Sequence, residues 1–372
     1  MSDLPVLFDE LETRGGGRIG IATLNAPKSL NALSLEMIHQ LTAKLDAWAS
    51  DREVVAVWLD GAGDKALCAG GDVVALYRAM TDDANADSDF AERYFANEYR
   101  LDHRIHTYPK PLIVWGNGIV MGGGLGLMAG GGQRVVTETT RIAMPEITIG
   151  LYPDIGASWF LNRMPPGVGA YLGLTGAQLN ARDALDLGLA DRLIAHASRQ
   201  AVLDALRESD FDSPHAAVRD VLRAFENRDQ APQAQAIQGK VIPRLDTIQS
   251  LVDAADVAGA VARILNDKRD DDWLAANRAR LAAGCPMSAH LVWRMLARHR
   301  HASLADAFRD ELNLSVQCCR QGELAEGVRA LLIDKDKNPR WSHADVASVP
   351  ERDIEAFLSP LWSSSEHPLK DL

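Results

Sequence analysis

The sequence predicts an α/β protein whose C-terminal region is helical. Strand-like and helix-like segments alternate from residue 5 to about residue 195, a pattern that predicts strands and helices in separate layers. From about residue 196 onward strand-like segments cease and Ala-, Leu- and Arg-rich helical patterns continue. We therefore expect two domains, residues 1–195 and 196–372, with an exposed, polar connection near residues 226–236.

The N-terminal elements follow from hydrophobic periodicity and turn residues. The segments VLFDELE and RIGIATLN flank the turn RGGG, which predicts a β-hairpin. Apolar residues then recur at helical spacing from Leu35 to Trp48, with Ser34 as the N-cap. EVVAVWLDG and PKPLIVWGNGIV read as strands, and RVVTETTRIAMPE supplies two shorter ones. Helices are expected in GASWFLNRM, GAYLGLTG and NARDALDLGLADRLI, the last of which ends in the strand-like DRLI.

The charge and composition exclude several classes of function. The net charge of −12 disfavours nucleic acid and anionic membrane as partners, and no apolar run is long enough to span a bilayer. The first residues are acidic and lack the pattern of a secretory or organellar leader. The four cysteines are few for this length and show no paired metal-ligand spacing, and the adjacent pair Cys318 and Cys319 cannot easily form a disulfide, which favours a reducing compartment. We therefore expect a cytoplasmic location.

The first candidate motif is KALCAGGDV, at residues 65–73, where Gly70 and Gly71 follow a strand and precede a helix that starts near Asp72. Two glycines there allow a backbone N–H to point outward at a helix start, where developing negative charge is favoured. An ordinary glycine-containing loop explains the same residues equally well.

The second motif is the glycine-rich segment at residues 116–132, GNGIVMGGGLGLMAGGG. Tight packing of a strand against a helix is one explanation. A dinucleotide fingerprint is another, because Gly124, Gly126 and Ala129 fit G-x-G-x-x-A and Glu146 lies about 20 residues further on. We disfavour the fingerprint, since it should open the first βαβ unit and its acidic residue should end a strand rather than follow a proline.

The third motif, MPEITIGLYPDIG at residues 144–156, places Glu146 and Asp154 directly after prolines and among apolar neighbours. Partly desolvated carboxylates suit acid–base or nucleophilic chemistry. Capping or turn roles remain open, and Asp154 could be the N-cap of GASWFLNRM. The chain has no G-x-S-x-G, P-loop or H-E-x-x-H motif, and the pair His103 and His106 has no evident third ligand, so no metal is expected.

In this order, the three motifs resemble those of the crotonase (enoyl-CoA hydratase/isomerase) superfamily, and LTGAQLNARDALDLGLADRLI resembles the segment that follows them in nearly every member. Two further segments, YFANEYRLDHRIHTYPKPLIVWGNGI and CCRQGELAEGVRALLIDKDKNPRW (318–341), resemble the 3-hydroxyisobutyryl-CoA hydrolase branch. The resemblance covers almost the whole chain. It implies a crotonase-like ββα spiral core with a helical C-terminal region, in a homo-oligomer that is trimer-based in the family.

The resemblance also implies an activity and a site. The activity is hydrolysis of the 3-hydroxyisobutyryl-CoA thioester, a step of valine catabolism, in which coenzyme A is part of the acyl-CoA substrate and no cofactor is required. The N–H groups of Gly71 and Gly123 match the oxyanion hole, Glu146 the catalytic carboxylate and Asp154 the acidic residue of the hydrolase branch. The substrate-binding positions are Glu98, Leu67, Ala69, Gly70 and Gly122.

One position departs from the hydratase pattern. Hydratases of the superfamily carry a second catalytic glutamate where this chain has Gly126. Glycine cannot orient or activate water, whereas one glutamate beside an oxyanion hole suffices to cleave a thioester. An enoyl-CoA hydratase or isomerase that uses Glu146 with Glu98 or Asp154 is the main alternative, and a non-catalytic acyl-CoA-binding protein is a distant one.

The phosphates of coenzyme A require cations, for which Lys335, Lys337 and Arg340 are candidates. A solvated charged turn is an equally good explanation of these three residues.

Overall fold

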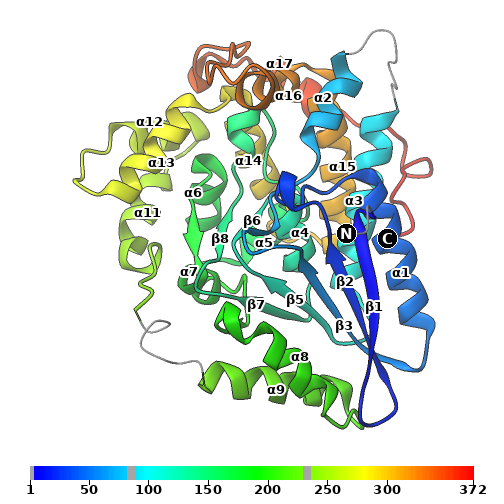
Figure 1. Cartoon of the computed structure of the whole chain (residues 1–372). Coiled ribbons are helices and arrows are strands. Elements are labelled where there is room, and N and C mark those ends of the chain that lie inside the picture. The colour runs from blue at the N-terminus through cyan, green and yellow to red at the C-terminus, as the bar shows by residue number, and fades with distance from the viewer. Residues whose placement is uncertain (1–3, 82–88, 229–235) are drawn as a thin grey trace. The chain divides into compact units, whose positions relative to one another are not determined.

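The computed structural model describes residues 4–81, 89–228 and 236–372 (Figure 1). Contacts between residues divide the chain into two compact units. Unit 1 comprises Met1–Gly71, Leu101–Ile142 and Leu179–Ile242, and unit 2 comprises Asp72–Arg100, Ala143–Gln178 and Pro243–Leu372. Contacts between residues do not test whether residues 1–195 fold independently of residues 196–372. The predicted division into these two domains therefore stays a prediction. Residues 229–235 of the predicted connection lie outside the described residues.

Unit 1 contains two sheets. The six-stranded sheet has the order β1-β2-β3-β5-β7-β10, parallel except for the β1–β2 hairpin. Its strands are β1 Val6–Glu12, β2 Arg18–Leu24, β3 Val54–Gly61, β5 Leu112–Gly116, β7 Gln133–Val136 and β10 Arg192–Leu193. The four-stranded sheet, in the order β4-β6-β8-β9, consists of β4 Ala66–Cys68, β6 Ile119–Met121, β8 Arg141–Ala143 and β9 Leu179–Asn180. The predicted hairpin is confirmed, but the segment PKPLIVWGNGIV, expected as one strand, is divided near Gly118 (φ 61°) into β5 and β6, which belong to different sheets. The two-residue β9 is too short to leave a periodic signal.

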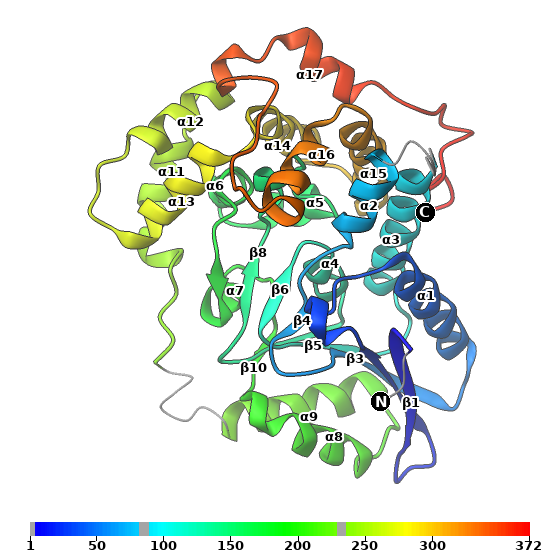
Figure 2. The same cartoon turned by 45° about the horizontal axis from the view of Figure 1, so that its top comes forward.

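Helices cover the larger sheet of unit 1. They are α1 Leu35–Ser50, α4 Gly123–Ala129, α7 Ala181–Asp186, α8 Arg199–Arg207 and α9 Pro214–Arg228. Helix α1 begins as predicted, because the Ser34 hydroxyl accepts the Met37 N–H at 3.2 Å. Helices α8 and α9 lie side by side in both views (Figures 1 and 2) and bury Leu206 and Leu222 against sheet residues such as Trp58 and Trp115. The predicted α/β architecture is confirmed.

Unit 2 is helical: beyond the last residue of β8, its described residues form helices and loops. Its helices are α2 Val73–Thr81, α5 Ala157–Phe160, α6 Val168–Thr175, α11 Leu245–Val252, α12 Val257–Asn266, α13 Asp272–Ala283, α14 Pro286–Arg298, α15 Leu304–Arg320, α16 Glu323–Val328 and α17 Glu351–Leu358. Helix α3, Phe90–His106, begins in unit 2 and ends in unit 1. None of the helices within the described residues combines the length and apolar character needed to cross a bilayer.

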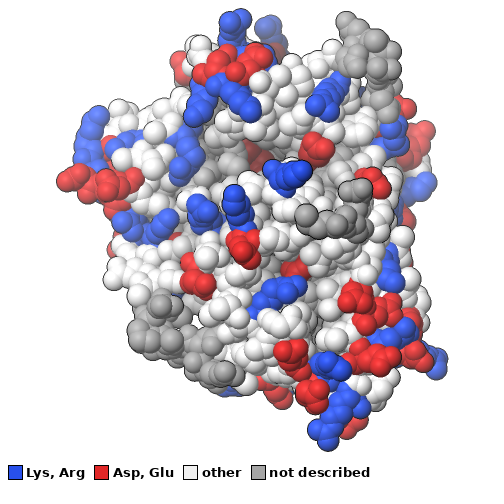
Figure 3. All heavy atoms as spheres, in the orientation of Figure 1, with Lys and Arg blue, Asp and Glu red and all other residues white. Residues whose placement is uncertain are grey.

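Acidic and basic side chains are interspersed on the face seen in Figure 3. Opposite charges also pair directly: Arg18 lies 2.6 to 2.9 Å from carboxylate oxygens of Glu10, Asp51 and Glu53. The net charge of −12 is therefore a sum over mixed surfaces, and the local field can differ in sign from the total.

Candidate active site

The first glycine motif forms a loop between β4 and α2. Leu67 is buried in β4, and Gly70 has a φ of +123°, a conformation that side-chain-bearing residues rarely adopt. The Ala69 N–H donates to the Leu30 carbonyl at 3.0 Å, and the Gly70 carbonyl accepts from the Leu33 N–H at 2.8 Å. These bonds hold the loop that leads into the half-buried Gly71.

The second glycine motif turns from β6 into α4. Gly122, with φ +49°, is the N-cap of α4, so Gly123 is the first helical residue and its N–H has no acceptor within the helix. A Cβ at Gly124 would lie 2.2 Å from the Cys68 carbonyl oxygen, which shows how tightly α4 packs on β4. A Cβ at Gly70 would lie 3.5 Å from the Met121 carbonyl oxygen and 4.0 Å from the Gly122 Cα. The two predicted oxyanion loops therefore lie next to each other in unit 1.

The dinucleotide alternative does not fit this geometry. Glu146 begins the 3-10 helix η2, Glu146–Ile149, instead of ending a strand, and α4 spans only seven residues. The tight-packing explanation accounts for Gly124.

The three predicted carboxylates, Glu98, Glu146 and Asp154, gather in unit 2. Glu98 lies on α3, Glu146 begins η2, and Asp154 lies in the loop before α5. Each of the three is at most 5% exposed. The Glu146 Oε2 atom is buried and has no hydrogen-bond partner among the described residues, so it is available to a ligand or water.

Burial and mutual repulsion shift the titration of this group. Burial, followed by the charges of Asp154 and Glu98, raises the pKa of Glu146 well above its ordinary value. Burial and then the charge of Asp154 do the same to the pKa of Glu98. Burial raises the pKa of Asp154 to about 6, and the hydrogen bond from Tyr99 opposes this rise. The charge of Asp154 therefore favours the protonated forms of Glu146 and Glu98.

A hydrogen-bond network orients Asp154. The Tyr99 hydroxyl donates to Asp154 Oδ2 at 2.5 Å and lies 2.6 Å from the Ser315 Oγ. Ser315 Oγ is also 2.9 Å from the Tyr152 hydroxyl, which donates to the Glu311 carbonyl at 2.8 Å. The N-cap of α5 is Gly156, so the alternative that Asp154 caps this helix is wrong.

The structure thus forms two groups of the predicted residues, a pair of glycine loops in unit 1 and a carboxylate cluster in unit 2. The sequence reasoning missed Tyr99, Tyr152 and Ser315. Tyr99 and Tyr152 lie within segments that were singled out. Ser315 lies 163 residues after Tyr152 and 216 after Tyr99, in a helix that carries no local signal.

The predicted cations lie in an exposed turn after α16. Lys335 and Lys337 have φ values of 57° and 55°, and their side chains and that of Arg340 form no ion pair within the described residues. Arg329 organises this turn by pairing with Glu326, Asp334 and Asp336. Binding of the coenzyme A phosphates by Lys335, Lys337 and Arg340 stays a prediction.

In residues 4–81, 89–228 and 236–372, no group of three or more His, Cys, Asp or Glu side chains could hold a metal ion.

Comparison with known proteins identifies similar chains over almost the full length. The family model described as "Enoyl-CoA hydratase/isomerase" matches residues 19–358. The mitochondrial 3-hydroxyisobutyryl-CoA hydrolase of Danio rerio is 36% identical over 96% of this chain and 90% of its own. The human protein of the same name is 33% identical over 94% and 88%, respectively.

Solved structures agree on the fold. A carnitinyl-CoA dehydratase from Mycobacterium thermoresistibile has a TM-score of 0.84 and 34% identity, covering 96% of this chain and 97% of its own. An enoyl-CoA hydratase from Rhodobacter sphaeroides has a TM-score of 0.81 and 32% identity, covering 96% and 98%. These neighbours confirm the expected crotonase fold.

The expected cytoplasmic location is wrong. The hydrolases of Danio rerio, Gallus gallus and Homo sapiens are each named mitochondrial. The expectation depended on the composition of the first residues and on the cysteines. All four cysteines are buried and none forms a disulfide, which is compatible with any reducing compartment.

Proposed function

The chain belongs to the enoyl-CoA hydratase/isomerase family, and we propose that it hydrolyses the thioester of 3-hydroxyisobutyryl-CoA to the free acid and coenzyme A. The observation that carries the proposal is its similarity, over more than nine-tenths of its length, to proteins named as hydrolases of this substrate. The resemblance to the hydrolase branch implies that this reaction is a step of valine breakdown.

Hydrolysis breaks the carbonyl carbon–sulfur bond and joins a water oxygen to that carbon. The Gly71 and Gly123 N–H groups would hold the carbonyl oxygen, and one such donor is worth about 3 to 4 kcal/mol on the charged intermediate. The first N–H groups of α4, which have no acceptor within the helix, and the neighbouring Gly70–Gly71 loop support this assignment. The thiolate of coenzyme A leaves and takes up a proton.

Glu146 would drive the attack, either as the nucleophile that forms a mixed anhydride or as the general base for water. Both roles require an ionised carboxylate with a free oxygen, and the unpartnered Oε2 atom is suited to either. Asp154 and Glu98 would hold the 3-hydroxyl group of the substrate or the attacking water. Their burial beside Glu146 supports this role, because a buried polar group discriminates strongly for a substrate that satisfies it.

Hydration or isomerisation of an enoyl-CoA is the second candidate, and the similarity to the enoyl-CoA hydratase of Rhodobacter sphaeroides favours it. The glycine at position 126 argues against it, since α4 carries no carboxylate that could serve as a second catalytic group.

An assembly based on trimers also stays a prediction.

Incubation of the purified protein with 3-hydroxyisobutyryl-CoA and, separately, with crotonyl-CoA tests the two candidates. Release of free thiol from the first supports hydrolysis, and loss of enoyl absorbance from the second supports hydration. We expect 3-hydroxypropionyl-CoA to react as well, because the missing methyl group is worth about 1 to 3 kcal/mol. A strong preference for acyl chains without a hydroxyl group would refute the assignment.

A further inference from the structure

The turn that follows Asp154 has an unfavourable backbone conformation. Ile155 has a φ of 58° and Gly156 a φ of 81°, two consecutive residues in the left-handed region. Glycine adopts it readily, but a β-branched residue such as Ile155 is a genuine outlier there. Such strain persists only where surrounding groups hold the backbone in place.

Glu311 supplies that hold from the middle of α15. Its side chain is fully buried, its Oε2 accepts the Gly156 N–H at 2.6 Å, and its Oε1 accepts the Ser158 N–H at 3.0 Å. The Ser158 hydroxyl donates to the same Oε1. The N-cap residue of α5, Gly156, has no side chain to accept these donors, so the carboxyl group of Glu311 performs the capping role from another helix.

The same helix reaches Asp154 from a second side. Ser315, one turn after Glu311, contacts the hydroxyl groups of Tyr99 and Tyr152, and Tyr99 donates to Asp154. Helix α15 therefore holds both the backbone after Asp154 and the donor to its carboxylate.

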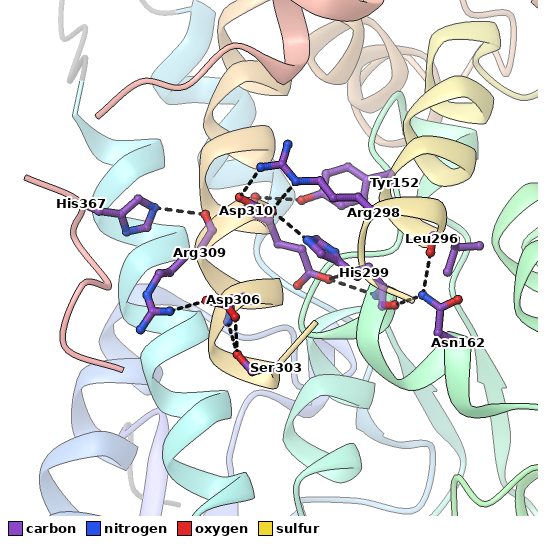
Figure 4. A network of polar contacts seen from close by, with 12 residues as sticks. Tyr152, Asn162, Leu296, Arg298, His299, Ser303, Asp306, Arg309, Asp310 and His367 are labelled. Atoms are coloured by element: carbon purple, nitrogen blue, oxygen red, sulfur yellow. Dashed lines mark hydrogen bonds and ion pairs between the residues drawn. The ribbon is translucent and has the colours of Figure 1, made fainter. Parts of the chain in front are cut away.

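Ser158 connects Glu311 to a chain of polar side chains. The Ser158 Oγ is 2.7 Å from His299 Nδ1, and His299 Nε2 is 2.9 Å from Asp310 Oδ2. Arg298 completes the chain 2.6 Å from Asp310 (Figure 4). Although burial opposes it, the hydrogen bond from His299 and the charge of Arg298 lower the pKa of Asp310.

These three side-chain types also make up serine hydrolase triads, but this group cannot act as one. Ser158 is only 2% exposed and its hydroxyl group is engaged by both Glu311 and His299. A nucleophile needs an oxygen that is not already engaged, and the Ser158 hydroxyl donates its proton to Glu311 instead of to His299.

The hydrogen bonds among Ser158, His299 and Asp310 are compatible with a protonated Glu311. Burial raises the pKa of Glu311 to about 8, while the hydrogen bonds from Ser158 and Gly156 oppose the rise. When protonated, Glu311 can donate to the Ser158 Oγ, Ser158 to His299 Nδ1, and His299 Nε2–H to the Asp310 carboxylate. When Glu311 is ionised, the Ser158 hydroxyl points back to it, so the acceptors for Gly156 and Ser158 persist in either state.

We propose that Glu311 is a positioning residue for catalysis, which holds the left-handed Ile155–Gly156 turn and thereby places the Asp154 carboxylate. Ser158, His299 and Asp310 complete this arrangement. The inference rests on the proposed function, in which Asp154 acts on the substrate or the water.

The decisive experiment is a double-mutant cycle between Glu311→Gln and Asp154→Asn. Glutamine replaces one acceptor oxygen by an NH₂ group that opposes a backbone N–H. We expect E311Q to lower kcat about tenfold, with KM within about twofold because Glu311 does not touch substrate. In the D154N background, E311Q should cause no further loss, since interacting residues are non-additive. Glu323→Gln is the matched control: Glu323 is also buried and accepts a backbone N–H, from Ser342 at 3.2 Å, and its effect should multiply with that of D154N.

Amide hydrogen exchange tests the turn independently of enzymatic activity. The amides of Gly156 and Ser158 should exchange about tenfold faster in E311Q, the effect of losing one hydrogen bond. Ser158→Ala serves if E311Q does not fold, because it removes only the hydroxyl group and should lower kcat in the wild-type background but not in D154N.

Multiplicative losses for E311Q and D154N, or unchanged exchange at residues 156 and 158, would overturn the proposal. A wild-type protein that releases no thiol from any acyl-CoA would instead refute the proposed function and leave the exchange test of the turn standing.

Discussion

Replacement of Asp154 by asparagine should stabilise the protein at neutral pH while impairing catalysis. Asp154 is 4% exposed, and burial raises its pKa from 3.8 to about 6. The folded state therefore binds the proton more tightly than the unfolded chain, so stability falls as pH rises from about 4 to 6. The difference amounts to about 3 kcal/mol above pH 6, at 1.36 kcal/mol per pKa unit. Asparagine carries no charge, and its oxygen can still accept the Tyr99 hydroxyl.

Urea unfolding of the wild type and D154N at pH 7.5 and pH 4 tests this expectation. The variant should be more stable by as much as about 3 kcal/mol at pH 7.5, and the gain should shrink to about 0.5 kcal/mol at pH 4. Asp183→Asn is the contrasting control, because this buried carboxylate accepts the N–H groups of Lys240, Val241 and Asn180 at 2.6 to 3.1 Å. D183N should lose about 1 to 3 kcal/mol. A D154N protein no more stable than the wild type at pH 7.5, or equally stabilised at both pH values, would refute the reasoning.

Three further expectations concern activity. Glu146→Gln should lower kcat at least about 100-fold, since an amide can neither attack nor accept a proton, while calorimetry shows unchanged affinity for coenzyme A; retention of a tenth of the turnover would place the chemistry elsewhere. Wild-type hydrolysis should rise with pH as Glu146 loses its proton, and in D154N the rising limb should move to lower pH because a negative neighbour is gone; a limb that stays in place would contradict this coupling. Gly126→Glu should abolish thiol release, because residue 126 is buried in α4 and a long side chain would fill that space; unchanged hydrolysis would remove the main argument against a hydratase.

Local patterns predicted most of the secondary structure of unit 1. The hairpin, α1 with its Ser34 cap, and strands β3, β5, β7 and β8 follow from side-chain period and turn residues, which are properties of contiguous sequence. The separation of β6 from β5 into another sheet was not predicted, because the apolar pattern runs through both. The glycine loops were also predictable, because their conformations require glycine at Gly70 and Gly122. The cytoplasmic location was wrong, since cell compartment is not encoded in the packing of the fold.

By itself, the sequence determined the fold class, the family and the identity of the three carboxylates, because each depends on residue types at short, ordered spacing. Only the tertiary structure decided the pKa values and the orientation of those carboxylates. The pKa of Asp154 depends on burial and on Tyr99, and the turn behind it on Glu311, which lies 157 residues further along the chain. Helix α15 is amphipathic like many others, and no local pattern distinguishes Glu311 and Ser315 from ordinary helical positions. Hydrogen bonds and desolvation act through space, so contacts between distant segments are set by folding and cannot be read from neighbours in the sequence.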